Sequence, residues 1–195
     1  MNEGPHRLDR LVHSAAMPAM AFLWGLAEAT LFFIVPDVLL TLIGCRSLRA
    51  GFGACGAALL GALTGGVIMY TAGHTAPEAS RALLARVPAI QQPLVEGVRR
   101  QVEERGVSAV LFGPTRGVPY KIYAVEWGAR SGNLPVFLLI SIPGRGIRFC
   151  LSVLLAAGAA RLLGPWTRRR PTTEMFIWAL FWVGFYAWYF SHFGW

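Results

Sequence analysis

The sequence predicts an all-α integral membrane protein in which two re-entrant helical hairpins and several spanning helices form an inverted repeat. The 195 residues are 55% hydrophobic and only 14% charged, which is unusual for a soluble domain. Two apolar stretches, residues 15–44 and 107–128, contain both prolines and charged residues. Charges near the centre of a bilayer are costly, so they usually face a cavity or a partner and mark a pathway.

The first broken element follows a polar, basic tail over residues 1–14 and extends over residues 15–49. It is longer than the ~20 residues needed to cross the hydrocarbon layer, and Pro36 interrupts it. This interruption favours a hairpin that enters and leaves the membrane on one side. Irregular backbone at membrane depth needs protein or water around it, and a hairpin tip inside a protein meets that need.

Residues 50–74 are expected to form the first uninterrupted spanning helix. Ala57, Gly61 and Gly65 recur at four-residue spacing, which leaves one face small enough for close helix packing. Residues 77–106 differ, because arginines and glutamates are interleaved with apolar side chains spaced three or four apart. That spacing predicts an amphipathic helix on the membrane surface, with a partner-binding helix as the alternative.

The second broken element covers residues 107–129, where Pro114 and Pro119 interrupt an apolar run. Residues 133–163 are then expected to form another spanning helix, which completes a membrane domain over residues 15–165. A final spanning helix, rich in Trp and Phe, is predicted over residues 174–195.

The basic clusters suggest how these elements are oriented in the membrane. If the N-terminal tail and the run Arg168–Arg170 both lie in the cytoplasm, the two hairpins open from opposite sides. Transporters with such inverted repeats build a midplane site from discontinuous helices. The basic segment 77–106 would then face outward, so the orientation stays open.

Six ionisable residues within the apolar segments are candidates for binding a lipid headgroup or a proton: Glu28, Asp37, Arg116, Lys121, Arg145 and Arg148. A hairpin tip at Pro36 would let the two carboxylates approach each other, where they take up protons or hold a cation. The alternative is that both carboxylates only satisfy arginine or backbone groups. For Asp37 we favour this structural role, as a cap of the second half-helix.

The basic candidates suit a phosphate group, because arginine offers a rigid fork of hydrogen-bond donors. Arg116 follows a Gly-Pro turn with exposed backbone N–H groups, and a structural bridge to Glu28 is the alternative. Arg145 and Arg148 lie three positions apart, so they can point into one cavity; an interfacial position is the alternative. Lys121 either reaches the same site or extends to the interface.

The sequence lacks the Walker, HExxH, CxxC and GxSxG patterns, so we expect neither an enzyme nor a cofactor. The net charge is +8, but the arginines are scattered at segment ends, which favours anionic headgroups over nucleic acid. No metal site is expected either, because the four histidines are dispersed: His6, His13, His74 and His192.

Three short motifs occur along the chain in an order that is typical of one membrane family. Glu28, Pro36 and Asp37, followed by a small-residue helix, resemble the first half of DedA-family proteins, also called the VTT or SNARE-associated domain. The stretch Phe112–Gly117 resembles that family's Phe-x-Pro-Gly-x-Arg motif. Residues Gly144–Arg148 are similar to a later motif of the small YqaA-like branch.

The resemblance spans roughly residues 20–165 and implies lipid translocation, including undecaprenyl phosphate recycling in bacteria and phospholipid scrambling in eukaryotes. It also implies two re-entrant hairpins that meet inside the bilayer. Glu28 and Asp37 would be the acidic pair, and Arg116 the motif arginine. The order Gly113-Pro114-Thr115 departs from the family pattern, which leaves the lipid open.

The sequence therefore favours a transporter or scramblase for a lipid with an anionic phosphate headgroup, such as a polyprenyl phosphate, with proton coupling as an option. A non-transporting membrane scaffold or assembly factor is one alternative, and a small-ion or solute transporter is the other. We expect a multi-pass protein of the inner (plasma) membrane whose partners are anionic lipids rather than nucleic acid. Homo-oligomerisation and the direction of transport stay open.

Overall fold

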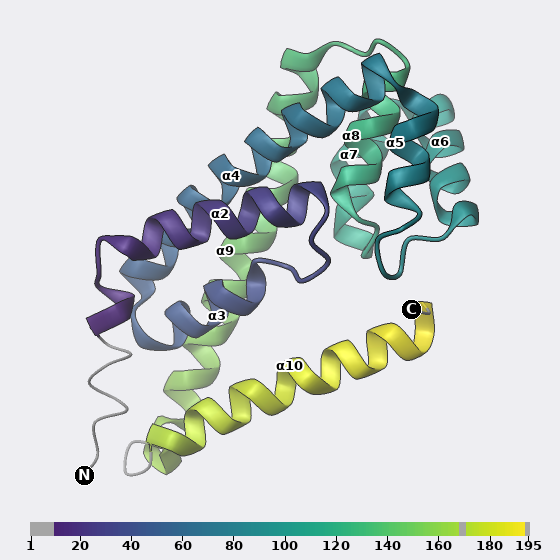
Figure 1. Ribbon diagram of the computed structural model, residues 1–195. Coiled ribbons are helices and arrows are strands. Elements are labelled where there is room, and N and C mark those ends of the chain that lie inside the picture. The colour runs from purple at the N-terminus through teal and green to yellow at the C-terminus, as the bar shows by residue number, and fades with distance from the viewer. Residues whose placement is uncertain (1–9, 168–170, 194–195) are drawn as a thin grey trace.

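The computed structural model describes residues 10–167 and 171–193, and all regular secondary structure in these ranges is helical (Figure 1). This confirms the predicted all-α class. Residues 1–9 of the predicted tail and the run Arg168–Arg170 lie outside the described residues. In chain order the elements are α2 (Ala16–Thr30), α3 (Asp37–Arg46), α4 (Leu48–Thr75), α5 (Pro77–Leu84), α6 (Gln92–Arg105), α7 (Val107–Phe112), η1 (Pro114–Arg116), α8 (Tyr120–Ala129), α9 (Leu134–Thr167) and α10 (Pro171–Phe193).

Two of the described helices are long and apolar enough to cross a membrane. They are α4, with 28 residues, and the 31-residue part Leu134–Gly164 of α9. Both exceed the ~20 residues that span the hydrocarbon layer. The C-terminal segment forms α10 but is not one of these two helices.

The first broken element consists of two helices that run in opposite directions (Figure 1). Helix α2 ends at Thr30, residues 31–36 are not helical, and α3 begins directly after Pro36. The loop is fixed by a hydrogen bond from the indole N–H of Trp24 to the carbonyl oxygen of Ile34, at 3.0 Å. The break therefore covers several residues and ends at the proline that the sequence indicates.

The second broken element also contains two helices, α7 and α8, separated by the single-turn helix η1. Gly117 follows η1 with φ +86°, a left-handed conformation that glycine adopts without steric cost. Pro119 then precedes the first residue of α8. The chain therefore turns at Gly117, between Arg116 at the end of η1 and the first residue of α8.

The segment 77–106 forms two helices rather than the single surface helix that the spacing predicts. Helices α5 and α6 are joined by residues 85–91, where Pro88 lies, and Pro93 falls in the first turn of α6, where proline is tolerated. Val95, Val98 and Val102 are buried, and α6 packs against α8. The apolar face of α6 therefore packs into the protein core.

The two broken elements and the two long helices pack in a reciprocal pattern. Helix α2 packs on α4 and α7 packs on α9, so the first helix of each broken element contacts the long helix that follows it. The second helix of each element packs on the other long helix, α3 on α9 and α8 on α4. Helices α4 and α9 also contact each other, which places the broken elements around a common centre.

Glycines allow the closest of these approaches. A Cβ added to Gly61 of α4 would lie 1.9 Å from the carbonyl oxygen of Phe22 in α2. A Cβ added to Gly73, also in α4, would lie 2.1 Å from the carbonyl oxygen of Val125 in α8. Since neither distance is sterically allowed, α4 touches both neighbours through its bare backbone.

Candidate functional site

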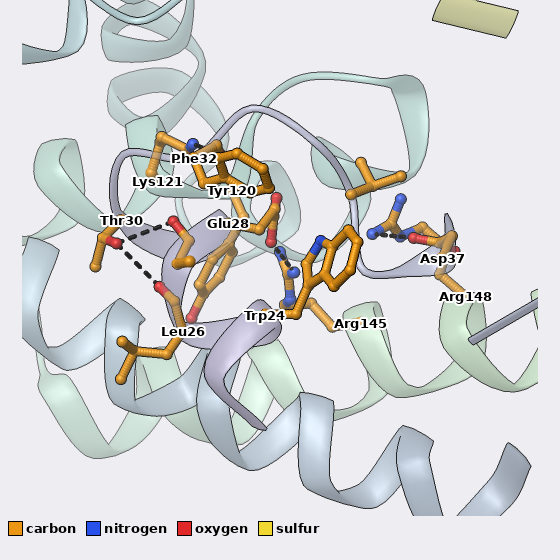
Figure 2. Close-up of polar contacts among 12 residues, drawn as sticks. Trp24, Leu26, Glu28, Thr30, Phe32, Asp37, Tyr120, Lys121, Arg145 and Arg148 are labelled. Carbon is orange, nitrogen blue, oxygen red and sulfur yellow. Dashed lines mark hydrogen bonds and ion pairs between the residues drawn. The ribbon is translucent and has the colours of Figure 1, made fainter. Parts of the chain in front are cut away.

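A cavity of about 670 Å³ lies between the loops of the two broken elements, α9 and α10. This volume falls within the ~300–1,000 Å³ range of small-molecule sites. Figure 2 shows the polar groups around the charged part of the cavity. Five of the six ionisable residues predicted from the sequence line it: Glu28, Asp37, Lys121, Arg145 and Arg148.

The deepest charged contact is an ion pair between Glu28 of α2 and Arg145 of α9. Arg145 Nη2 donates a hydrogen bond to Glu28 Oε2, and the two residues are only 2% and 6% exposed (Figure 2). The guanidinium carbon of Arg145 also lies 4.6 Å from the ring centroid of Tyr120. Arg145 Nε is buried without a hydrogen-bond partner, so this guanidinium keeps one donor available.

A second ion pair joins Asp37 of α3 to Arg148 of α9. Arg148 Nη2 lies 2.9 Å from Asp37 Oδ2, and the Ser152 hydroxyl donates to Asp37 Oδ1 at 2.5 Å. Asp37 is the first helical residue rather than the N-cap, which is Pro36 and makes no side-chain cap. The predicted capping role is therefore wrong, and the carboxylate binds Arg148 and Ser152 instead.

The two arginines act from one face of α9, as their spacing predicts. Arg145 is buried, whereas the side chain of Arg148 remains 29% exposed beside its carboxylate partner. The first arginine is thus held deep in the protein, and the second is accessible from the cavity. The two arginines and their two carboxylate partners therefore lie together in the wall of the cavity.

Lys121 connects the two broken elements. It is the second residue of α8, it is 2% exposed, and its Nζ donates to the carbonyl oxygen of Phe32 at 2.6 Å. Phe32 lies in the non-helical loop that follows α2 (Figure 2). Of the two positions that the sequence leaves open for Lys121, the structure has the one in the cavity wall.

Arg116 does not join this group. It is exposed in η1, it is not among the residues that line the cavity, and its backbone N–H bonds locally to Gly113. The bridge to Glu28 considered from the sequence is absent from the described contacts, since Glu28 pairs with Arg145. Arg116 instead borders a separate recess of about 60 Å³ that also contains Gln101 and Arg105.

Sequence reasoning also missed an ion pair outside the cavity. Glu126 of α8 is fully buried and accepts two hydrogen bonds from Arg81 of α5, from Nε and Nη2 at 2.8 Å each. These hydrogen bonds raise the pKa of Arg81, so its guanidinium stays protonated. The pair fastens α5 to α8. An acidic residue in an apolar run was visible in the sequence, but its partner 45 positions away was not.

Helix α10 contacts the first broken element through aromatic side chains. The indole N–H groups of Trp178 and Trp182 both donate to Thr41 Oγ1 at 3.1 Å. The Tyr186 hydroxyl accepts the backbone N–H of Val35 at 2.9 Å. The spacing of four residues puts these three aromatic side chains on one face of α10, which closes one side of the cavity.

The part of the chain that the structure describes contains no group of three or more His, Cys, Asp or Glu side chains that could hold a metal ion. Comparison of the chain with protein-family models, characterised proteins and solved structures found no match.

Proposed function

We propose that this protein is a membrane transporter or scramblase that moves lipids with an anionic phosphate headgroup across the bilayer. The observation that carries the proposal is the pair of arginine–carboxylate contacts in the wall of one cavity of about 670 Å³. Ionisable groups buried beside a cavity in an apolar protein mark a pathway for a charged ligand.

The reciprocal packing of the helices supports an inverted repeat of two re-entrant hairpins. In transporters with such repeats the binding site lies at the interface between the repeats and is typically formed by discontinuous helices. The helix contacts follow this pattern. Helices α2 and α8 pack on α4, and α3 and α7 pack on α9. Membrane insertion is further supported by highly exposed apolar side chains on the long helices, such as Leu60 and Leu155.

The charged groups give a mechanism for headgroup binding and release. A phosphate oxygen that enters the cavity meets the accessible Arg148 first and then competes with the Asp37 carboxylate for this guanidinium. The unpartnered Nε of Arg145 offers a further donor. A carboxylate that loses its arginine partner binds a proton more readily, so displacement of Asp37 or Glu28 would couple headgroup movement to protons.

The resemblance to the DedA family agrees with this function. Glu28 and Asp37, which match the family's acidic pair, are the two carboxylates in the cavity wall, and Arg145 and Arg148 match the later arginines of the YqaA-like branch. We therefore propose membership of that family, and a polyprenyl phosphate as one candidate lipid. Arg116, which matches the motif arginine, lies outside the cavity lining.

The test is reconstitution of the purified full-length chain into liposomes that contain a fluorescent anionic phospholipid, with and without a pH gradient. We expect faster movement of that lipid between leaflets than in protein-free liposomes. Arg148→Gln should slow it by at least about tenfold, because hydrogen bonds to charged groups contribute about 1.5–3 kcal/mol. Arg116→Gln is the matched control and should keep the wild-type rate, since this exposed arginine lies outside the cavity.

Three outcomes would contradict the proposal. If the wild-type protein moves no lipid but carries soluble phosphate or another ion, it is a solute transporter. If it moves neither, the buried charges only hold the helices together, as in a membrane scaffold. If Arg148→Gln and Arg116→Gln move lipid at equal rates, lipid movement does not depend on the arginine in the cavity wall.

A further inference from the structure

We propose that α9 and α10 form a binding slot for the hydrocarbon tail of the lipid whose headgroup binds at the two arginines. The inference rests on the proposed function and specifies that the ligand is an intact lipid. We call this part of the cavity the tail slot. It is defined by Ala156, Ala159, Ala160 and Leu163 of α9 and by Ile177 and Phe181 of α10.

The cavity has two chemically different ends along the same face of α9. Arg145, Arg148 and Ser152 line the charged end, and after Ser152 the residues that α9 contributes are all leucine or alanine. The distance from Ser152 to Leu163 along the helix is about 16 Å, at 1.5 Å per residue. An apolar surface of this length therefore continues directly from the arginines.

Helix α10 supplies the opposite wall of the tail slot. The hydrogen bonds of Trp178 and Trp182 to Thr41 hold it beside the first broken element. Figure 1 shows α10 leaving the end of α9 and diverging from it beneath α3. No Asp, Glu, Lys or Arg occurs between Glu174 and the end of the chain, so this wall is uncharged.

The tail slot opens sideways to the exterior of the protein. Leu155 and Phe181 line the cavity and yet are 73% and 62% exposed. Large apolar side chains exposed beside a cavity are typical of contact with lipid or with an apolar ligand. A tail bound here can leave into the bilayer without crossing a polar barrier.

The combination of the two ends favours a lipid over a soluble anion. Free phosphate would use only the arginines, and an apolar slot joined to them would have no role in its binding. An amphiphile satisfies both ends at once, with its anion at Arg148 and its hydrocarbon between Ala159 and Phe181. The three alanines keep the α9 wall small, so the slot has room for a chain that a larger side chain would block.

The test is Ala159→Trp in the reconstituted full-length protein, which fills the tail slot without changing a charge. We expect movement of a long-chain fluorescent anionic phospholipid to fall by about tenfold or more. Binding of inorganic phosphate at the charged end should stay at the wild-type level. Ala187→Trp is the matched control, because Ala187 is exposed on α10 and does not line the cavity; it should behave as wild type.

Wild-type long-chain lipid movement in Ala159→Trp would overturn the tail slot and leave the proposed function intact. Absence of lipid movement in the wild-type protein would overturn the proposed function and the slot with it. A second measurement covers the case in which Ala159→Trp does not fold. A phospholipid with a photoreactive group in its tail should label wild-type α9 and α10 within residues 155–185, and labelling confined to other helices would overturn the proposal.

Discussion

Arg145 and Glu28 form a buried ion pair although 117 positions separate them in the sequence. The contact joins the middle of α9 to the last turn of α2, next to the loop that interrupts the first broken element. Both charges are almost completely removed from solvent. Since a buried charge without its partner is strongly destabilising, this pair ties the last turn of α2 to α9.

The first prediction concerns the stability of this pair. Glu28→Gln and Arg145→Gln should each lower the free energy of unfolding by roughly 3–5 kcal/mol, because each leaves one buried charge uncompensated. The double variant should lose less than the sum of the single losses, by about 0.5–3 kcal/mol. Denaturant unfolding in detergent micelles measures all three values. Strictly additive losses would show that the two groups do not interact.

The second prediction concerns the fastening of α5 to α8. Arg81→Ala should destabilise the protein by roughly 3–5 kcal/mol, because it leaves the fully buried Glu126 unpaired. Arg99→Ala is the matched control. The Arg99–Glu103 pair is 3.4 Å apart and exposed, so its loss should cost less than about 1 kcal/mol. Thermal unfolding of the two variants in parallel gives the comparison, and equal effects would contradict the structural role of Glu126.

The third prediction compares two glycines of α4. Gly61→Ala should strongly destabilise the protein, because the new methyl group would lie 1.9 Å from the carbonyl oxygen of Phe22 and force α2 away. At Gly56 nothing lies within 4 Å of an added Cβ. Gly56→Ala should therefore be neutral or stabilise the helix by about 0.5–1 kcal/mol. The same unfolding assay tests both, and a stable Gly61→Ala protein would contradict the close α2–α4 contact.

The fourth prediction concerns the attachment of α10. Thr41→Val removes the oxygen that accepts the indole N–H groups of Trp178 and Trp182, and each unsatisfied donor costs about 1–3 kcal/mol. Amide hydrogen exchange in α10 should become at least about fivefold faster. Thr41→Ser keeps the hydroxyl and should exchange as wild type does. If Thr41→Val also leaves exchange unchanged, other contacts hold α10 in place.

Comparison of the two broken elements shows which parts of the site can be predicted from the sequence. Proline placement predicts both interruptions, because a proline in a helix interior removes a backbone hydrogen bond of the preceding turn. The spacing of Arg145 and Arg148 also predicts that both share one face of α9. Arg116 lies in a comparable apolar context but is exposed before the turn at Gly117, whereas Lys121, after that turn, lines the cavity.

The amino-acid sequence by itself determined the all-helical class, the two interruptions and the set of charges within apolar segments, because each depends on residues that are near one another in the chain. The tertiary structure alone decided which charges pair. Glu28 with Arg145, Asp37 with Arg148 and Glu126 with Arg81 depend on how distant helices pack. It also made one wall of the cavity from α10, through hydrogen bonds to Thr41 that span more than 130 positions. Local spacing carries no information on such contacts, since they arise only when the helices have packed together.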